Sequence, residues 1–176
     1  MIRCYVTDRR GADVIACARR AIGDGIEYIQ IREKDLTTLE LFDLTCRIRD
    51  LATGTATRVL VNGRLDVSLA TQIDGVHLPS KGLPPQRVRP LVSVLGMSTH
   101  SLEEVMAAEE AGADFVVFGP VFDTPGKEPV GLDVLHGVVS AVRIPVLAIG
   151  GVNPSTISRI IDAGAAGFAA IRMFQS

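Results

Sequence analysis

The sequence contains no tryptophan, only three cysteines, and a formal net charge of just −2 over 176 residues. Cys4, Cys17 and Cys46 form neither a CxxC pair nor a Cys/His ligand spacing, so we expect free thiols, with Cys4 and Cys17 buried. The small net charge disfavours a broad surface for nucleic acid or membrane. No apolar run is long enough to span a bilayer, and residues 1–6 form a strand pattern too short for a signal peptide. We therefore expect a cytoplasmic protein that binds neither nucleic acid nor membrane.

Hydrophobic residues make up 47% of the chain, which is typical of one globular domain, and we expect a single domain over residues 1–176. Short apolar runs alternate with segments of helical periodicity. The expected strands cover residues 2–7, 26–32, 58–61, 75–78, 93–96, 115–119, 146–149 and 167–171. The expected helices cover residues 12–23, 38–53, 65–71, 102–111, 133–141 and 155–163.

Several of these strands are continuous runs of Val, Ile and Leu, as expected for parallel strands buried on both faces. Glycines at residues 23–25, 112–114 and 164–167 mark helix ends directly before strands. Eight such units in order predict an α/β fold, a (β/α)8 TIM barrel. Only residues 173–176 follow the expected eighth strand, so we expect a barrel that lacks most of the last helix. A homodimer is one arrangement that would cover the strand it leaves exposed.

Active sites in this fold lie at the carboxyl ends of the strands. The second strand ends in Gln30, Arg32 and Lys34, which suits an anionic, phosphorylated small molecule. Glu33 could instead pair with these cations. The other polar strand ends or loops supply further candidates for binding this molecule: Asn62, Thr124, Gly150, Gly151 and Arg172.

Gly150 and Gly151 allow backbone N–H groups to approach a phosphate, and residues 154–155 open a helix aimed at it. The alternative is a glycine turn needed only for chain reversal. Lys127 lies in a Gly- and Pro-rich loop long enough to act as a flap, where it either reaches the ligand or is simply solvated.

His100 is a candidate general acid/base, because Ser101 or Thr99 can cap the following helix and leave the imidazole free. His77 is interpreted as a hydrogen-bonded residue of the barrel, and His136 as a surface residue on a helix. His100 and Lys127 are therefore the candidate catalytic side chains.

Together these strand ends resemble the thiamine-phosphate synthase family, which includes its relative the thiazole tautomerase (TenI). The similarity covers essentially the whole chain, through motifs at residues 5–8, 30–34, 62–64, 74–78, 98–101, 112–114, 119–122 and 148–152. The resemblance implies a synthase that joins hydroxymethylpyrimidine diphosphate to thiazole phosphate and releases diphosphate with the help of Mg²⁺. It also implies the roles of single residues. Gln30, Arg32, Lys34 and Asn62 would hold the diphosphate, Thr124 and Lys127 would form the flap, and Gly151 would contact the thiazole phosphate.

The chain departs from that pattern where the family holds Mg²⁺. The family has Asn-Asp-Arg after strand three, but here Gly63 stands between Asn62 and Arg64. The acid expected after strand four is also absent from residues 79–82. Arg172 stands where the family usually has a serine. If the protein is a thiazole tautomerase, Arg172 would help Gly151 to hold the phosphate.

The missing acids favour a metal-independent thiazole tautomerase with no cofactor, in which His100 moves the proton and Lys127 and Arg32 hold a carboxylate. The alternatives are a thiamine-phosphate synthase, with Mg²⁺ held differently, a non-catalytic binder of thiamine intermediates, and another barrel enzyme that binds sugar phosphates.

Overall fold

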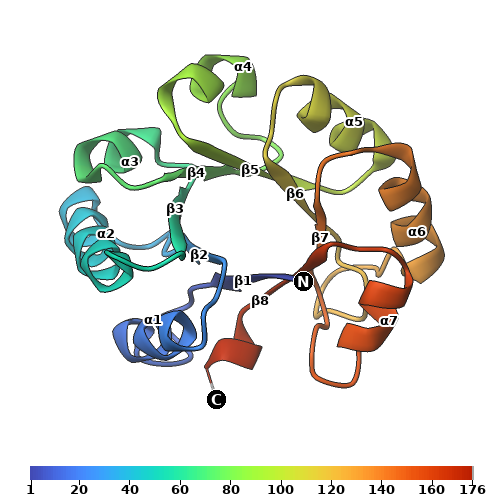
Figure 1. Cartoon of the computed structure of the whole chain (residues 1–176), viewed down its shortest axis with the longest axis horizontal. Coiled ribbons are helices and arrows are strands. Elements are labelled where there is room, and N and C mark those ends of the chain that lie inside the picture. The colour runs from blue at the N-terminus through green and yellow to red at the C-terminus, as the bar shows by residue number, and fades with distance from the viewer. Residues whose placement is uncertain (176) are drawn as a thin grey trace.

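Eight parallel strands close into a barrel in the order β1 to β8, with helices around the outside (Figure 1). The computed structural model describes residues 1–175. The strands are β1 (Ile2–Val6), β2 (Tyr28–Ile31), β3 (Arg58–Asn62), β4 (Gly75–Leu78), β5 (Val94–Thr99), β6 (Phe115–Phe118), β7 (Val146–Ala148) and β8 (Gly167–Ala170). The helices are α1 (Val14–Gly23), α2 (Thr38–Ala52), α3 (Leu65–Thr71), α4 (Pro85–Val88), α5 (Leu102–Glu110), α6 (Leu132–Ala141) and α7 (Ile157–Asp162), with 3₁₀ turns η1 (Arg89–Leu91) and η2 (Arg172–Phe174).

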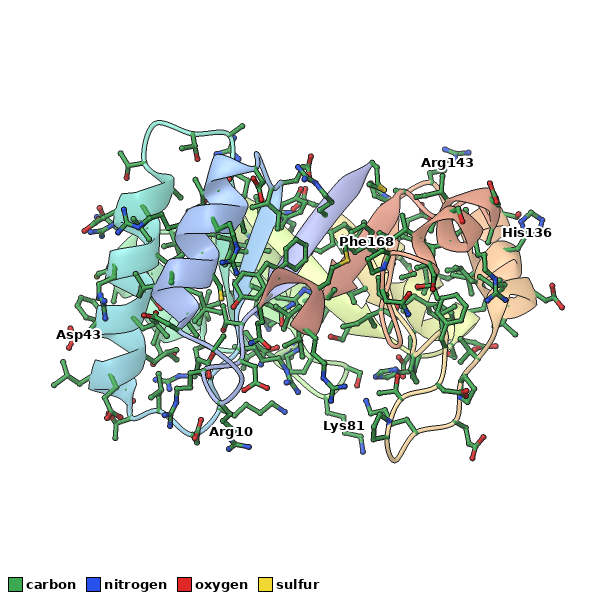
Figure 2. All side chains as sticks on the ribbon, turned by 90° about the horizontal axis from the view of Figure 1, so that it is seen from below. Arg10, Asp43, Lys81, His136, Arg143 and Phe168 are labelled. Atoms are coloured by element: carbon green, nitrogen blue, oxygen red, sulfur yellow. The ribbon has the colours of Figure 1, made fainter. Side chains whose placement is uncertain are left out.

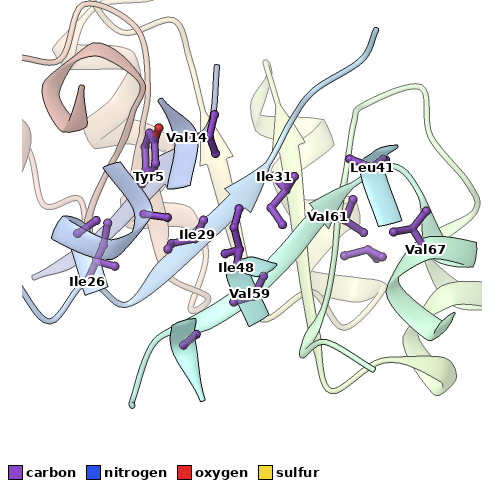
Figure 3. Packing of buried hydrophobic residues seen from close by; sticks show 14 of the residues in the cluster. Tyr5, Val14, Ile26, Ile29, Ile31, Leu41, Ile48, Val59, Val61 and Val67 are labelled. Carbon is purple, nitrogen blue, oxygen red and sulfur yellow. The ribbon is translucent and has the colours of Figure 1, made fainter. Parts of the chain in front are cut away.

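Side chains alternate along each strand between the barrel interior and the surrounding helices. Outward-facing strand residues such as Ile29 and Val61 pack against helix residues such as Leu41 and Ile48 (Figure 3). A separate cluster fills the interior and consists of strand residues only: Cys4, Val6, Leu60, Phe115, Val117, Leu147 and Ala169. Because the strands are buried on both their inner and their outer faces, several of them are unbroken apolar runs in sequence.

The predicted barrel is confirmed, with local differences. The fifth strand runs to Thr99 and not to Gly96. No helix was predicted where α4 and η1 lie, because Pro84, Pro85 and Pro90 interrupt any helical pattern there. The helix predicted from residue 155 begins at Ile157, since a turn held by Asn153 precedes it. Cys4 and Cys17 are buried, as expected.

The short turn η2 lies where the last helix of such a barrel would stand. The Phe174 ring lies 5.4 Å from the Tyr5 ring and 6.3 Å from the Phe168 ring, centroid to centroid, which covers the outer face of β1 and β8. The Gln175 side chain donates to the Asp8 carbonyl at 2.7 Å. Since β8 is buried by its own chain, a homodimer is not needed to cover this strand. The homodimer itself stays a prediction.

Figure 2 shows Lys81, which follows β4, at one rim of the barrel, and Arg143, which precedes β7, at the opposite rim. The rim that carries Lys81 is therefore the one where the strands end. Across residues 1–175, no helix has the length and apolar character needed to cross a membrane.

Candidate active site

A cavity of about 820 Å³ opens at the carboxyl ends of the strands. Every candidate residue of the sequence analysis lines it: Gln30, Arg32, Lys34, Asn62, His100, Thr124, Lys127, Gly150, Gly151 and Arg172. Ser98, His77 and Asp123, which were not among the predicted site residues, also line the cavity.

The floor of the cavity has a polar side and an apolar side. Inward-facing residues on the neighbouring strands β2 to β5 supply the polar side: Gln30, Asn62, His77 and Ser98. Residues from β6 to β1 supply the apolar side: Val117, Ile149, Ala169, Ile171 and Val6. Such a floor suits a flat ring that has hydrogen-bonding groups along one edge. The two-residue period from Gly96 to Ser98 was the signal that could have placed Ser98 inside.

Glu33 does not neutralise the cations beside it. Its carboxylate is 5% exposed and accepts the backbone N–H of Arg9 at 3.1 and 3.2 Å, which anchors the loop after β1. The backbone N–H of Arg32 donates to Thr7 Oγ1 at 3.0 Å. Within residues 1–175, neither Arg32 nor Lys34 forms a salt bridge. The charges of Arg32 and Lys34 therefore remain available to a ligand.

Arg64 lies outside the site although it belongs to the same motif as Asn62. Its guanidinium donates to both oxygens of the Asp66 carboxylate, at 2.9 and 2.6 Å, and to Thr38 Oγ1 at 3.0 Å. Asp66 raises the pKa of Arg64, and Arg64 lowers that of Asp66. Arg64 therefore connects α2 and α3 and does not line the cavity.

Gly150 and Gly151 have φ angles of +94° and +65°, which favour glycine. A Cβ on Gly150 would lie 2.4 Å from Pro120 Cβ, and one on Gly151 would lie 2.6 Å from Phe122 Cβ. The glycines thus permit close packing of the flap that follows β6, in addition to exposing backbone to the cavity. The helix predicted to open at residues 154–155 begins at Ile157 and has six residues, and its first residue is not part of the cavity lining.

The flap, residues 119–131, is folded over this glycine turn. The Val121 N–H in the flap donates to the carbonyl of Ile149, the residue directly after β7, at 2.8 Å. At its tip Lys127 N donates to the Thr124 carbonyl at 3.0 Å, closing a tight turn. The Arg159 guanidinium lies 5.1 Å from the Phe122 ring centroid and holds the base of the flap from α7. Lys127 is exposed at the mouth of the cavity.

His100 is oriented by its neighbours. Its Nδ1 lies 2.6 Å from the Gly119 carbonyl, which can only accept, so Nδ1 carries the proton of that bond, and in the neutral imidazole Nε2 is left as an acceptor. Ser101 caps α5 by accepting from Glu104 N at 3.3 Å, as predicted. His77, by contrast, is 1% exposed within the barrel and bonded to Ser98, and His136 is exposed on α6, as both were interpreted.

Four cations line the cavity, Arg32, Lys34, Lys127 and Arg172, against one carboxylate, Asp123, among the residues described. No group of three or more His, Cys, Asp or Glu side chains suited to a metal occurs within residues 1–175. Gly63 and residues 79–82 stand where the family pattern implied by the resemblance has its Mg²⁺ ligands, and none of them offers a carboxylate. The donor set therefore does not fit a Mg²⁺ ion held by this protein, since hard Mg²⁺ is bound through carboxylates together with phosphate oxygens.

Residues 4–174 match the family described as thiamine monophosphate synthase. The chain belongs to the thiamine-phosphate synthase family. A thiamine-phosphate synthase of Methanocella arvoryzae is 40% identical over 94% of this chain and 83% of its own length. One of Chlorobium phaeobacteroides is 37% identical over 96% of this chain and 85% of its own. The solved structure of a thiamine phosphate pyrophosphorylase from Pyrococcus furiosus is 34% identical, with a TM-score of 0.89 over 97% of this chain and 85% of its own. This protein is accordingly an enzyme of the thiamine-phosphate synthase family, with the barrel fold of its relatives.

Proposed function

We propose that this enzyme is a thiamine-phosphate synthase, which joins a pyrimidine diphosphate to a thiazole phosphate and releases diphosphate. The observation that carries the proposal is the charge of the cavity, which within residues 1–175 is lined by four cationic side chains and one acidic side chain. Arg32 and Lys34 stand at the end of β2, while Arg172 stands after β8 and Lys127 on the flap. The names of the relatives at 37 to 40% identity support the same reaction over the tautomerase preferred from the sequence.

In this proposal the two anionic groups occupy different parts of the rim. Gln30, Arg32, Lys34 and Asn62 bind the diphosphate, and Lys127 approaches it from the flap. The Gly151 backbone and Arg172 bind the thiazole phosphate. The pyrimidine lies on the floor with its polar edge toward β2 to β5.

The reaction breaks the bond between the pyrimidine methylene carbon and the diphosphate oxygen, and the thiazole nitrogen forms the new bond to that carbon. Departure of the diphosphate is the costly step, because negative charge grows on the leaving oxygen. The arginine and lysine side chains line the cavity and would neutralise that charge, and Asp123 is the one carboxylate beside them among the described residues. The flap and the apolar side of the floor exclude water that would otherwise capture the reactive carbon.

A thiazole tautomerase is the second candidate, favoured by one specific observation. His100, as a neutral imidazole, presents Nε2 as an acceptor at the rim of a cavity in which the described residues include one carboxylate and no carboxylate pair for a metal, which suits proton transfer without a cofactor. The anions to be bound would then be one phosphate and one carboxylate, the latter held by Arg32 and Lys127.

The test is a two-substrate assay that follows diphosphate release with and without EDTA. The synthase predicts release from wild-type protein, and Arg32→Gln should lower kcat/KM by about tenfold or more, because it removes a charged hydrogen-bond donor. Arg64→Gln is the matched control, since that arginine lies outside the cavity and is bonded to Asp66. Arg64→Gln should leave kcat/KM within about twofold of wild type.

Other outcomes would replace the proposal. Metal-free uptake of deuterium into the thiazole carboxylate, lost in His100→Asn and without diphosphate release, would establish the tautomerase. Thermal stabilisation by both substrates with turnover in neither assay would indicate a non-catalytic binder.

A further inference from the structure

A buried histidine and a serine form a pair in the floor of the cavity. His77 on β4 is 1% exposed, and its Nε2 lies 2.9 Å from Ser98 Oγ on β5. The other ring nitrogen, Nδ1, has no hydrogen-bond partner within residues 1–175. A Cβ on Gly96 would lie 2.7 Å from Nδ1, so the glycine is what lets the ring fit against β5.

The surroundings of His77 keep its ring neutral. Burial, together with the smaller effect of the positive charge of Arg32, lowers the pKa of His77 to about 3. A neutral imidazole has one N–H donor and one acceptor nitrogen. If Nδ1 carried the proton, a buried N–H would have no acceptor, an arrangement that is rarer in proteins than an unfilled acceptor. The proton therefore belongs on Nε2, where Ser98 accepts it.

This arrangement sets the direction of the Ser98 hydroxyl. Once Ser98 Oγ accepts from His77, its own O–H can only donate elsewhere. Ser98 is partly exposed and lines the cavity, and the His77 contact is its one side-chain hydrogen bond within residues 1–175. The hydroxyl proton therefore points toward the ligand.

We propose that His77 is a positioning residue, which as the Nε2–H tautomer holds the Ser98 hydroxyl as a hydrogen-bond donor to an acceptor atom of the substrate ring. The pair is not a nucleophile with its base, because His77 donates the bond and does not accept it. This inference rests on the cavity being the substrate site proposed above.

The tautomer can be read in the unmodified enzyme. The chain has three histidines, so long-range ¹H–¹⁵N spectra of protein labelled at histidine contain three rings, assigned through His100→Gln and His136→Gln. We expect the His77 ring to show protonated Nε2 and bare Nδ1, unchanged between pH 5.5 and 8.5. A protonated Nδ1, or titration of His77 in this range, would overturn the proposal.

A double-mutant cycle tests the link to Ser98. Ser98→Ala and His77→Phe should each lower kcat/KM by about tenfold, the effect of one lost hydrogen bond, while Ser98→Thr keeps most of the activity. The double variant should be no worse than Ser98→Ala alone, because His77 acts only through that hydroxyl. Losses that multiply in the double variant would refute the link, and a His77→Phe protein that fails to fold leaves the spectra to decide.

The experiments separate this inference from the proposed reaction. If wild-type protein releases no diphosphate, the synthase proposal fails, and the cycle is then measured by calorimetry as the affinity for the ligand that wild type binds, the pyrimidine diphosphate or the thiazole phosphate carboxylate. Equal affinities of wild type and Ser98→Ala for that ligand would refute the role of Ser98.

Discussion

Replacing Gly150 with alanine tests whether the flap must pack directly on the glycine turn. Gly150 has a φ of +94°, where a side chain is strained. The added Cβ would lie 2.4 Å from Pro120 Cβ and 2.6 Å from Pro120 Cα. Ordinary contact begins at 3.4 Å, so the flap must move by 3.4 − 2.4 = 1.0 Å. Backbone atoms must move with it, since the ring of Pro120 cannot rotate away.

Two costs add in this variant. The left-handed backbone costs an alanine about 1–2 kcal/mol, and overpacking costs about 1–3 kcal/mol more, so the free energy of unfolding should fall by about 2–5 kcal/mol. A displacement of about 1 Å in a group that positions the substrate can reduce the rate about a hundredfold. We expect kcat/KM to fall by about that factor.

Gly54→Ala is the matched control, because Gly54 has a φ of +80° and nothing within 4 Å of an added Cβ. It follows α2, on the rim opposite the cavity, and should lose only the backbone contribution of about 1–2 kcal/mol, with unchanged kcat/KM. Urea denaturation measures the stabilities, and diphosphate release or deuterium uptake measures the activity. Equal destabilisation of the two variants, or full activity of Gly150→Ala, would show that the flap does not depend on this contact.

Three further predictions concern single side chains. Lys127→Ala should lower kcat/KM by about tenfold to a hundredfold without changing Tm, since it removes an exposed charged donor at the cavity mouth, whereas Lys81→Ala, outside the cavity lining, should match wild type. Below pH 6.5 His77 is protonated in the unfolded chain, whereas in the folded protein it stays neutral down to about pH 3. The free energy of unfolding should therefore decrease as the pH is lowered from 6.5 to about 3. Urea titrations should show a shallower fall for His77→Phe, and an equal slope would contradict the assignment. Because burial raises the pKa of Cys4 to about 12, a thiol reagent should modify the partly exposed Cys46 in native protein and Cys4 only after denaturation, as mass spectrometry can check.

The barrel could be predicted from the sequence because its pattern is local. Each buried parallel strand is a short apolar run, and several helix ends carry a glycine, as at Gly112 and Gly164, whose φ angles are +81° and +93°. Strand ends follow from the same pattern, so the polar residues from Gln30 to Lys34 could be assigned to one rim. The proline-rich segment of α4 has no such pattern, and it was missed.

Which of those rim residues face the cavity was decided by contacts between distant segments. Glu33 and Arg64 stand beside candidate residues in sequence, yet Glu33 accepts from the Arg9 backbone and Arg64 pairs with Asp66. A Cβ at position 150 has no room because Pro120, on another loop, packs against Gly150. Hydrogen bonds and van der Waals contacts act over a few ångströms of space, irrespective of separation along the chain. The amino-acid order thus determined a ring of strands with a cationic rim, whereas the folded packing decided that His77 and Ser98 meet on its floor.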